Sequence, residues 1–252
     1  MTNEDKTAKK YCLILGGNSG LGQALAARFA QEGYNLLLTS KYAEKFDQQF
    51  SNQLIQRCGI CASWHVFDGM DYAAHPAFYQ GLPNSPEVVI AAIGYLGDQE
   101  QGQNDFREVQ QIMGSNLLAQ VSILNLAAQA MEKRKSGSII GISSVAGERG
   151  RKKNYIYGAA KAGFSVYLSG LRNQLCAQGI QVLTVLPGYL GTNMLSGDKW
   201  PGWLITSPLQ AAEQIFRAFK TGKKIIYVSP RWRWIMACIK LIPESIFCRT
   251  NF

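Results

Sequence analysis

The chain has 252 residues, of which 47% are hydrophobic and 17% charged, a composition ordinary for one globular domain with a sizeable core. No apolar run approaches the ~18 residues of a membrane-spanning helix, and residues 1–11 are polar, so we expect no secretory leader. The net charge of +9 allows nucleic acid, anionic lipid or phosphorylated substrates as partners, and we expect a reducing, cytoplasmic setting.

Seven short runs rich in leucine or β-branched residues predict strands, and most are separated by segments with helical spacing of apolar residues. This alternation is typical of βαβ units, so we predict an α/β fold with one doubly wound, parallel, seven-stranded sheet and helices on both faces. No repeat or linker divides the chain, which predicts one domain over residues 1–252. The predicted strands are YCLIL (11–15), NLLLT (35–39), SWHVF (63–67), EVVIAAI (87–93), GSIIGIS (137–143), IQVLTVL (180–186) and KIIYV (224–228). The predicted helices cover about residues 20–32, 105–133, 155–178 and 208–220.

A glycine cluster, GGNSGLG, stands between the first predicted strand and the first predicted helix. Such a turn lets the backbone approach a pyrophosphate, whose charge then rests on the free amides of the helix N-terminus. The spacing is G-x-x-x-G-x-G rather than G-x-G-x-x-G, and a tight turn without a ligand is the alternative. We predict a Rossmann-type dinucleotide site with Gly16, Asn18, Ser19, Gly20, Leu21 and Gly22 as cofactor contacts.

The end of the second predicted strand bears on which dinucleotide binds. A carboxylate there would accept hydrogen bonds from a ribose 2′-hydroxyl, whereas a cation would bind a 2′-phosphate. The residues are Thr39, Ser40 and Lys41, with no carboxylate. We therefore predict NADP as the cofactor and Lys41 as a contact. NAD stays open, with Lys41 then a solvated surface residue.

Three residues between Ile142 and Gly163 predict a catalytic site. Tyr157 and Lys161 are four residues apart on a predicted helix, so both project from one face. An ammonium group there would lower the phenol pKa from ~10 toward the range useful for proton transfer. Ser144, after the fifth predicted strand, could donate a hydrogen bond to a substrate carbonyl oxygen. A Tyr-x-x-x-Lys pattern alone is weak, since such residues on a helix usually serve packing and solvation.

The motifs together make the chain resemble the short-chain dehydrogenase/reductase family over nearly its full length. The resemblance rests on GGNSGLG, Asp68 after the third predicted strand, Asn116 in GSNLLAQ, Ser144 thirteen residues before Tyr157, Lys161, and PGYLGTNM from Pro187 to Met194.

The resemblance implies a role for each matching residue. Tyr157 would be the acid/base, Ser144 would orient and polarise the carbonyl, and Lys161 would also bind the nicotinamide ribose. Asn116 would help to hold a proton-relay water, whereas the neighbouring Tyr155 and Ser143 do not fit the family's spacing. The catalytic residues carried over are Asn116, Ser144, Tyr157 and Lys161, and the further cofactor contacts are Asp68, Gly94, Tyr157, Lys161, Pro187, Gly188 and Thr192.

Two departures from the family pattern affect the predicted cofactor site. The family usually has threonine where this chain has Leu15, and Asn-Asn-Ala-Gly where it has Ala91-Ala92-Ile93-Gly94. The first of those asparagines normally ties the sheet together near the adenosine ribose. We therefore expect no side-chain contact at Ala91, but a backbone contact at Gly94.

Three segments are similar to one subgroup of the family, the reductase component of the epimerase that forms decaprenylphosphoryl arabinose: AAIGYLGDQE, SSVAGERGRKKNYIYGAAKAG and RWRWIMACIKLIPESIF. This similarity implies a keto sugar on a polyprenyl phosphate as substrate, and a flavin oxidase partner that creates the ketone. The alternative among enzymes is a 3-ketoacyl-thioester or small-carbonyl reductase, and the alternative outside them is a non-catalytic dinucleotide-binding protein. The family habit implies a homo-oligomer. Nucleic acid is not expected, because no recognised nucleic-acid module accompanies the charge.

The loop GERGRKKN, residues 147–154, lies between the predicted catalytic serine and tyrosine and holds four cations. Because its ends are anchored at the predicted active site, we expect these cations to neutralise a substrate phosphate. A solvated surface loop is the alternative. The cations are Arg149, Arg151, Lys152 and Lys153.

The C-terminal extension, residues 230–252, interleaves aromatic, aliphatic and basic side chains. From Lys220 onward seven cations face the single acid Glu244, so this part carries six of the nine net positive charges. Pro243 limits a helix there to about three turns, which is too short to span a bilayer. We predict peripheral contact with the inner face of the cytoplasmic membrane, and packing into the core or a subunit interface is the alternative.

Six cysteines are scattered along the chain, and Cys58 and Cys61 form a C-x-x-C pair. A structural zinc site needs two more ligands, and the only histidines, His65 and His75, are not at finger spacing. We therefore predict buried, reduced thiols and no metal.

Overall fold

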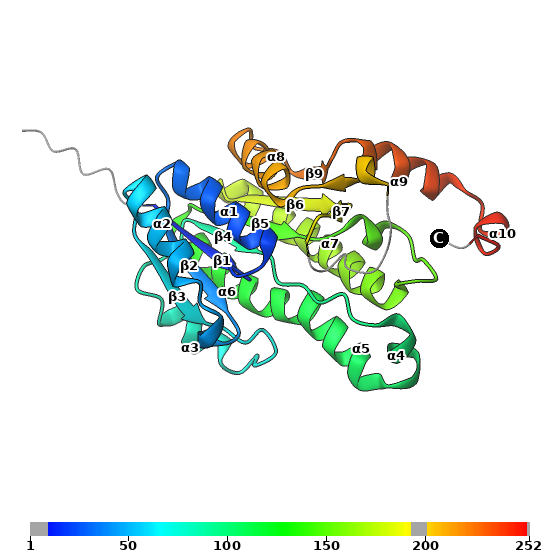
Figure 1. Cartoon of the computed structure of the whole chain (residues 1–252), viewed down its shortest axis with the longest axis horizontal. Helices are drawn as coiled ribbons and strands as arrows, with labels where there is room; N and C mark the ends of the chain where they lie inside the picture. The colour runs from blue at the N-terminus through cyan, green and yellow to red at the C-terminus, as the bar shows by residue number, and fades with distance from the viewer. Residues whose placement is uncertain (1–9, 193–200, 251–252) are drawn as a thin grey trace, which may run out of the picture.

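The central sheet has seven parallel strands in the computed structural model, which describes residues 10–192 and 201–250 (Figure 1). The strand order, β3-β2-β1-β4-β5-β6-β9, reverses between β1 and β4, and at such a switch ligands bind beyond the carboxyl ends of the strands. The doubly wound α/β prediction is confirmed, and every predicted strand is present to within two residues at either end. The strands are β1 (Tyr11–Leu15), β2 (Asn35–Ser40), β3 (Ala62–Val66), β4 (Val88–Ala91), β5 (Ser138–Ile142), β6 (Gln181–Pro187) and β9 (Ile225–Val228).

Most of the sheet is buried on both faces, because neighbouring residues of its strands alternate between two cores. In β1, Cys12 and Ile14 pack into one core, whereas Leu13 and Leu15 pack into the other. A strand with two buried faces is apolar throughout, which explains the continuous hydrophobic runs of the sequence. The first core is covered by α1 (Gly20–Gln31), α2 (Gln48–Cys58) and α8 (Pro208–Lys220), and the second by α3 (His75–Gln80), α6 (Ala119–Arg134) and α7 (Tyr155–Leu175).

All four predicted helices are present, although the second is interrupted. Between α5 (Phe106–Met113) and α6 the chain makes a π-helical turn over Gly114–Leu118, a form often found at functional sites. Helices α2, α3 and α4 (Gln99–Asn104) were not predicted, because they are short or mostly polar.

The C-terminal extension forms two helices, α9 (Arg231–Leu241) and α10 (Glu244–Phe247), with Pro243 between them. Helix α9 has 11 residues, which confirms the expected length of about three turns. None of the helices in residues 10–192 and 201–250 combines the length and apolar character that crossing a bilayer requires.

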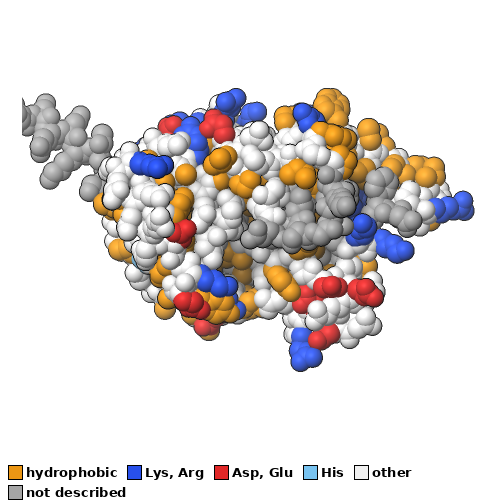
Figure 2. All heavy atoms as spheres, in the orientation of Figure 1, with side chains coloured by type: hydrophobic (Ala, Val, Ile, Leu, Met, Phe, Trp, Pro, Cys, Tyr) orange, Lys and Arg blue, Asp and Glu red, His pale blue; other side chains and the backbone are white. Residues whose placement is uncertain are grey.

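The two faces of α9 have different surroundings. Trp232, Met236 and Ile239 are buried in a core cluster of their own, so the alternative of internal packing is correct for this face. On the other face, Trp234 and Leu241 are 71% and 82% exposed. Figure 2 shows hydrophobic side chains gathered over α9 and α10, with basic side chains beside them. One face of α9 therefore packs against the protein core, and the opposite face is an exposed amphipathic surface in this chain.

Parts of three predicted features lie outside the described residues. They are residues 1–9 of the polar start, Asn193 and Met194 of the PGYLGTNM motif, and the last two residues of the C-terminal extension. The minor elements are β7 (Tyr189–Leu190) and β8 (Ile205–Thr206), which pair in a small parallel sheet, and 3₁₀ turns at Ala43–Lys45, Val145–Glu148, Cys176–Gln178 and Gly202–Leu204.

Candidate active site

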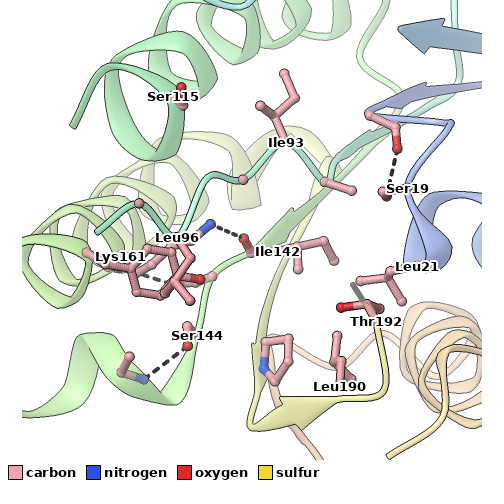
Figure 3. A pocket seen from close by; sticks show the side chains of 18 of the residues that line it. Ser19, Leu21, Ile93, Leu96, Ser115, Ile142, Ser144, Lys161, Leu190 and Thr192 are labelled. Carbon is pink, nitrogen blue, oxygen red and sulfur yellow. Dashed lines mark hydrogen bonds between the residues drawn. The ribbon is translucent and has the colours of Figure 1, made fainter. Parts of the chain in front are cut away.

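A cavity of about 1230 Å³ runs along the carboxyl end of the sheet. It connects the glycine turn after β1 with the start of α7 and the inner face of α9. Figure 3 shows Ser19, Leu21 and Thr192 at one end of it and Ser144 and Lys161 at the other. The predicted residues that line the cavity are Gly16, Asn18, Ser19, Gly20, Leu21, Lys41, Asp68, Gly94, Ser144, Tyr157, Lys161, Pro187, Gly188 and Thr192, whereas Gly22 and Asn116 do not line it.

The glycine turn has the shape that receives a pyrophosphate. Gly16 has a φ of +85°, a conformation that favours glycine. Ser19 caps α1, because its Oγ accepts a hydrogen bond from the Gly22 amide at 3.0 Å and donates one to the Gly16 carbonyl at 2.8 Å. A Cβ on Gly22 would overlap the Gly16 carbonyl oxygen. Gly22 therefore shapes the turn and does not line the cavity, and its role as a cofactor contact stays a prediction.

The end of β2 carries two groups suited to an anion. Lys41 lies at the cavity, but its Nζ pairs with Asp68 Oδ2 at 3.2 Å, and this hydrogen bond raises the pKa of the lysine. Ser40 Oγ also lies at the cavity, is buried, and has no hydrogen-bond partner among the described residues. An unpartnered buried hydroxyl costs free energy that a ligand can recover. The sequence predicts the contact at Lys41 but not the one at Ser40, because only the structure shows that this hydroxyl lacks a partner within the described part of the chain.

Ser144, Tyr157 and Lys161 meet where β5 ends. Ser144 is the N-cap of the following 3₁₀ turn, and its Oγ accepts a hydrogen bond from the Ala146 amide at 3.1 Å. Tyr157 and Lys161 lie on the first two turns of α7, and both are buried. Lys161 Nζ donates to the Ile142 carbonyl at 3.0 Å and lies 5.7 Å from the centre of the Tyr157 ring (Figure 3). The three residues, which are spaced 13 and four positions apart in the sequence, thus form a single cluster at the cavity.

Burial controls the proton affinities of this cluster. It raises the pKa of Tyr157 to about 12, although a hydrogen bond with Ser144 acts in the opposite direction. Burial also lowers the pKa of Lys161 to about 7. The expected lowering of the Tyr157 pKa is therefore wrong for this arrangement, because the effect of burial outweighs that of the Ser144 hydrogen bond. Tyr157 holds its proton at neutral pH and is suited to donate it.

Asn116 lies behind the cavity wall, in the π-helical turn. Its side chain is fully buried, donates to the Tyr95 carbonyl at 2.5 Å and to the Ile112 carbonyl at 2.8 Å, and accepts from the Tyr95 amide at 3.2 Å. Its own carbonyl accepts a hydrogen bond from Gln120 Nε2 at 2.9 Å. Asn116 thus fastens the loop that follows β4 and carries Gly94. Its role in a proton relay stays a prediction.

The two neighbouring residues that did not fit the family spacing have other partners. Ser143 Oγ is bonded to the Lys161 carbonyl at 2.9 Å and to Ser165 Oγ at 2.7 Å, so it joins β5 to α7. Tyr155 is 44% exposed, and its hydroxyl accepts a hydrogen bond from Gln103.

The charged loop is divided between two tasks. Arg149 donates to the carbonyls of Ile239 at 2.5 Å and Ile242 at 2.7 Å, and pairs with Glu244 at 3.0 Å. It thereby satisfies the free carbonyls at the end of α9, which corrects its prediction as a phosphate contact. Arg151 and Lys153 line the cavity, whereas Lys152 is exposed and does not.

The inner face of α9 forms a wall of the cavity that the sequence did not reveal. Trp232, Ile235 and Ile239 line it. Gly188 lies against the Trp232 indole so closely that a Cβ there would overlap the ring. A helical spacing of apolar residues predicts which face is buried, but it does not say what that face covers.

The prediction of buried thiols is correct for Cys12, but it is wrong for Cys176, Cys238 and Cys248, which are exposed, and for the C-x-x-C pair. Cys61 is exposed and Cys58 is half-buried, because they flank the loop between α2 and the edge strand β3. All six cysteines are free. Within the described parts of the chain, no three His, Cys, Asp or Glu side chains gather as a metal site would need.

The sequence model of the family described as short chain dehydrogenase matches residues 10–200. An uncharacterized oxidoreductase of Mycobacterium tuberculosis is 32% identical over 97% of this chain and 98% of its own length. The ketoacyl reductase HetN of Nostoc is 28% identical over 87% of this chain and 78% of its own length. The structure of a short-chain dehydrogenase from Sphingobium yanoikuyae in complex with NADPH has a TM-score of 0.80 at 22% identity, over 94% of this chain and 97% of that one. With its sheet order, glycine turn and serine, tyrosine and lysine cluster, the chain belongs to the short-chain dehydrogenase family of oxidoreductases.

Proposed function

We propose that the chain is an NADPH-dependent reductase that converts a ketone to a secondary alcohol. The observation that carries this proposal is the meeting of Ser144, Tyr157 and Lys161 at one end of a cavity whose other end is the glycine turn. When bound, the dinucleotide supplies a hydride. A purified sample that consumes NADPH only when a ketone is added supports the proposal, and inertness toward every class of ketone speaks for the non-catalytic alternative.

The side chains of the cluster divide the remaining work. Ser144 Oγ accepts a hydrogen bond from a backbone amide and is hydrogen-bonded to Tyr157, so its hydroxyl can turn its proton from Tyr157 to the carbonyl oxygen of a bound substrate. Tyr157 donates the proton that converts this oxygen to a hydroxyl. Lys161 donates one N–H to the Ile142 carbonyl. Its other Nζ hydrogen-bonding positions bind the nicotinamide ribose, as family membership implies.

The choice of NADPH rests on the end of β2, where Ser40 and Lys41 lie at the cavity. Two structures similar in fold hold this cofactor type: the Sphingobium yanoikuyae dehydrogenase binds NADPH, and ElxO binds NADP. A 2′-phosphate would give Ser40 Oγ its missing partner and would compete with Asp68 for Lys41.

We expect Lys41→Asp to shift the preference between NADPH and NADH by at least ~10-fold toward NADH, because the new carboxylate repels a 2′-phosphate. The measurement is kcat/KM with each cofactor. Lys45→Asp is the matched control, since Lys45 is a nearby exposed cation that does not line the cavity. Equal kinetics with both cofactors before and after the Lys41 change would leave Lys41 as a surface residue.

For the substrate we propose a keto sugar carried on a lipid phosphate or another phosphorylated carrier. Support comes from the apolar wall of α9 beside the cations Arg151 and Lys153, which suits a ligand with a lipid part and an anionic part. Such a substrate requires a partner oxidase, flavin-dependent by resemblance, that makes the ketone first. The alternative, a 3-ketoacyl-thioester reductase, is favoured by the similarity to a protein named ketoacyl reductase. A homo-oligomer is part of the same proposal.

We also propose that the exposed side of α9 and α10 binds the inner face of the cytoplasmic membrane. Trp234 and Leu241 lie seven residues apart on α9, and Ile246 follows on α10, so all three point away from the core. The cations Arg233 and Arg249 are exposed beside them. Exposed aromatic and aliphatic side chains with adjacent cations suit a layer of anionic headgroups.

We expect the protein to cosediment with anionic vesicles at low salt, and to be released at high salt. Trp234→Ser should weaken this binding, whereas Val166→Ser, at a site that is 72% exposed on α7, should not. Trp232 is unsuitable for this test, because it is buried in the core beneath α9. If the folded protein stays in the supernatant at low salt, this surface does not bind membranes.

A further inference from the structure

Three buried polar atoms at the Tyr157 end of the cavity have no hydrogen-bond partner among the described residues. They are Gln99 Nε2, Arg151 Nε and Asn154 Oδ1. Seven such side-chain atoms occur in the described residues, and three of the seven belong to residues at this end of the cavity. Each unsatisfied buried polar group costs roughly 1–3 kcal/mol, which a bound ligand can recover.

The three side chains are held in place by their other contacts. Gln99 Oε1 accepts a hydrogen bond from the Ile156 amide at 3.0 Å, which ties the start of α4 to the first turn of α7. Asn154 is the N-cap of α7, yet its side chain caps nothing, although Asn usually caps a helix at this position. The Arg151 guanidinium reaches Met236 Sδ on α9 at 3.3 Å, a weak acceptor for a charged donor. Gln99 and Arg151 are thus fixed through their other side-chain atoms, whereas Gln99 Nε2, Arg151 Nε and Asn154 Oδ1 have no hydrogen-bond partner among the described residues.

The charges of the lining residues favour an anionic ligand. Arg151, Lys153 and Lys161 line the Tyr157 end. Asp68 is the only acid among the described residues that line the cavity, and it pairs with Lys41 at the β2 end. Among the described residues, the lining of the Tyr157 end therefore holds cations and no carboxylate.

We infer that Gln99, Arg151 and Asn154 form a substrate-recognition subsite for a hydroxylated ketone that carries a phosphate. The amide and guanidinium N–H groups would bind phosphate or carbonyl oxygens, and the Asn154 carbonyl would accept a hydrogen bond from a ligand hydroxyl. The alkyl chain of a ketoacyl thioester offers none of these groups. This inference rests on the proposed function, and it selects the sugar phosphate among the substrate classes named above.

Binding in the presence of NADP⁺, measured by calorimetry, tests the subsite without requiring turnover. The probes are xylulose 5-phosphate, xylulose, and xylulose carried on a short isoprenyl phosphate. We expect at least one phosphorylated probe to bind at least ~10-fold more tightly than xylulose, the scale of one charge-assisted hydrogen bond. Tighter binding of xylulose 5-phosphate would identify a free sugar phosphate as the ligand, and tighter binding of the isoprenyl-linked probe would identify a lipid-linked one.

Two variants and a control assign the effect to the subsite. Arg151→Met should abolish the preference for phosphate, and Gln99→Glu should do the same while keeping the oxygen that accepts the Ile156 amide. Lys152→Met removes the same charge from the same loop but does not line the cavity, so the preference should persist. If Arg151 had only a structural role, Arg151→Met would weaken the binding of all three probes by the same factor.

The inference is overturned if the wild type binds xylulose and its phosphates equally, or if the Lys152 variant loses the preference as the Arg151 variant does. NADPH consumption with cyclohexanone reports separately on the proposed function. A protein that reduces no ketone but prefers the phosphorylated probe keeps the subsite and loses the reductase assignment.

Discussion

Tyr157→Phe is expected to lower turnover at least ~100-fold while NADPH binding stays nearly unchanged, because the phenol supplies a proton and little else. The measurements are steady-state NADPH consumption with the best ketone and NADPH fluorescence titration. Tyr155→Phe is the matched control, since this tyrosine lies two residues earlier on α7 and is 44% exposed. A Tyr157 variant that keeps most of its rate would remove the proton-donor assignment. Lys161→Ala should lose turnover and also weaken NADPH binding.

The same assignment fixes how each reaction direction depends on pH. Reduction uses protonated Tyr157, and burial raises the pKa of this group to about 12, so its acid form persists through neutral pH. Alcohol oxidation needs the phenolate, so kcat/KM for oxidation should rise with pH toward that value. A plateau of the oxidation rate already reached near neutral pH would mean that the working pKa of Tyr157 is low, as its spacing from Lys161 alone predicts.

Much of the fold follows from the sequence because local patterns decide it. A parallel sheet buried on both faces requires continuous apolar strands, and β1, β4 and β6 therefore stand out as apolar runs. Helices with a buried stripe are equally visible, as α8 is. Helix α4 is not, since its sequence QEQGQN has no apolar periodicity and its position depends on contacts with α5 and α7.

The catalytic residues could be predicted because their spacing on one strand end and one helix is local information. The pKa of Tyr157 could not, because it depends on how much water the surrounding fold removes. Nor could the partition of the loop cations: Arg149 binds the end of α9, which lies about 90 positions away along the chain, whereas Arg151 faces the cavity. Sequence patterns identify charge, but tertiary structure determines what the charge meets.

Gly188→Ala should be among the most damaging changes outside the catalytic residues, because it forces the inner face of α9 away from the active site. The added Cβ would overlap the indole ring of Trp232. That ring is 3% exposed and makes an edge contact with Tyr189, with ring centres 5.2 Å apart, so moving it aside would break this packing or push the ring into the cavity. Overpacking a core typically costs about 1–3 kcal/mol. We expect a lower melting temperature and at least a ~10-fold loss of kcat/KM, because Trp232 lines the cavity.

Gly191→Ala is the matched control, since its Cβ would meet the Ile205 side chain at 3.5 Å, an ordinary van der Waals distance. A second substitution separates overlap with Trp232 from any other effect at Gly188. Trp232→Ala alone should cost about 3–5 kcal/mol of stability, the usual range for a buried tryptophan. Trp232→Ala removes the three atoms nearest to a Cβ at 188, so the double variant should be no less stable than Trp232→Ala. Additive losses in this double-mutant cycle would show that Gly188 is required for its backbone, and that α9 does not press on the active site through Trp232.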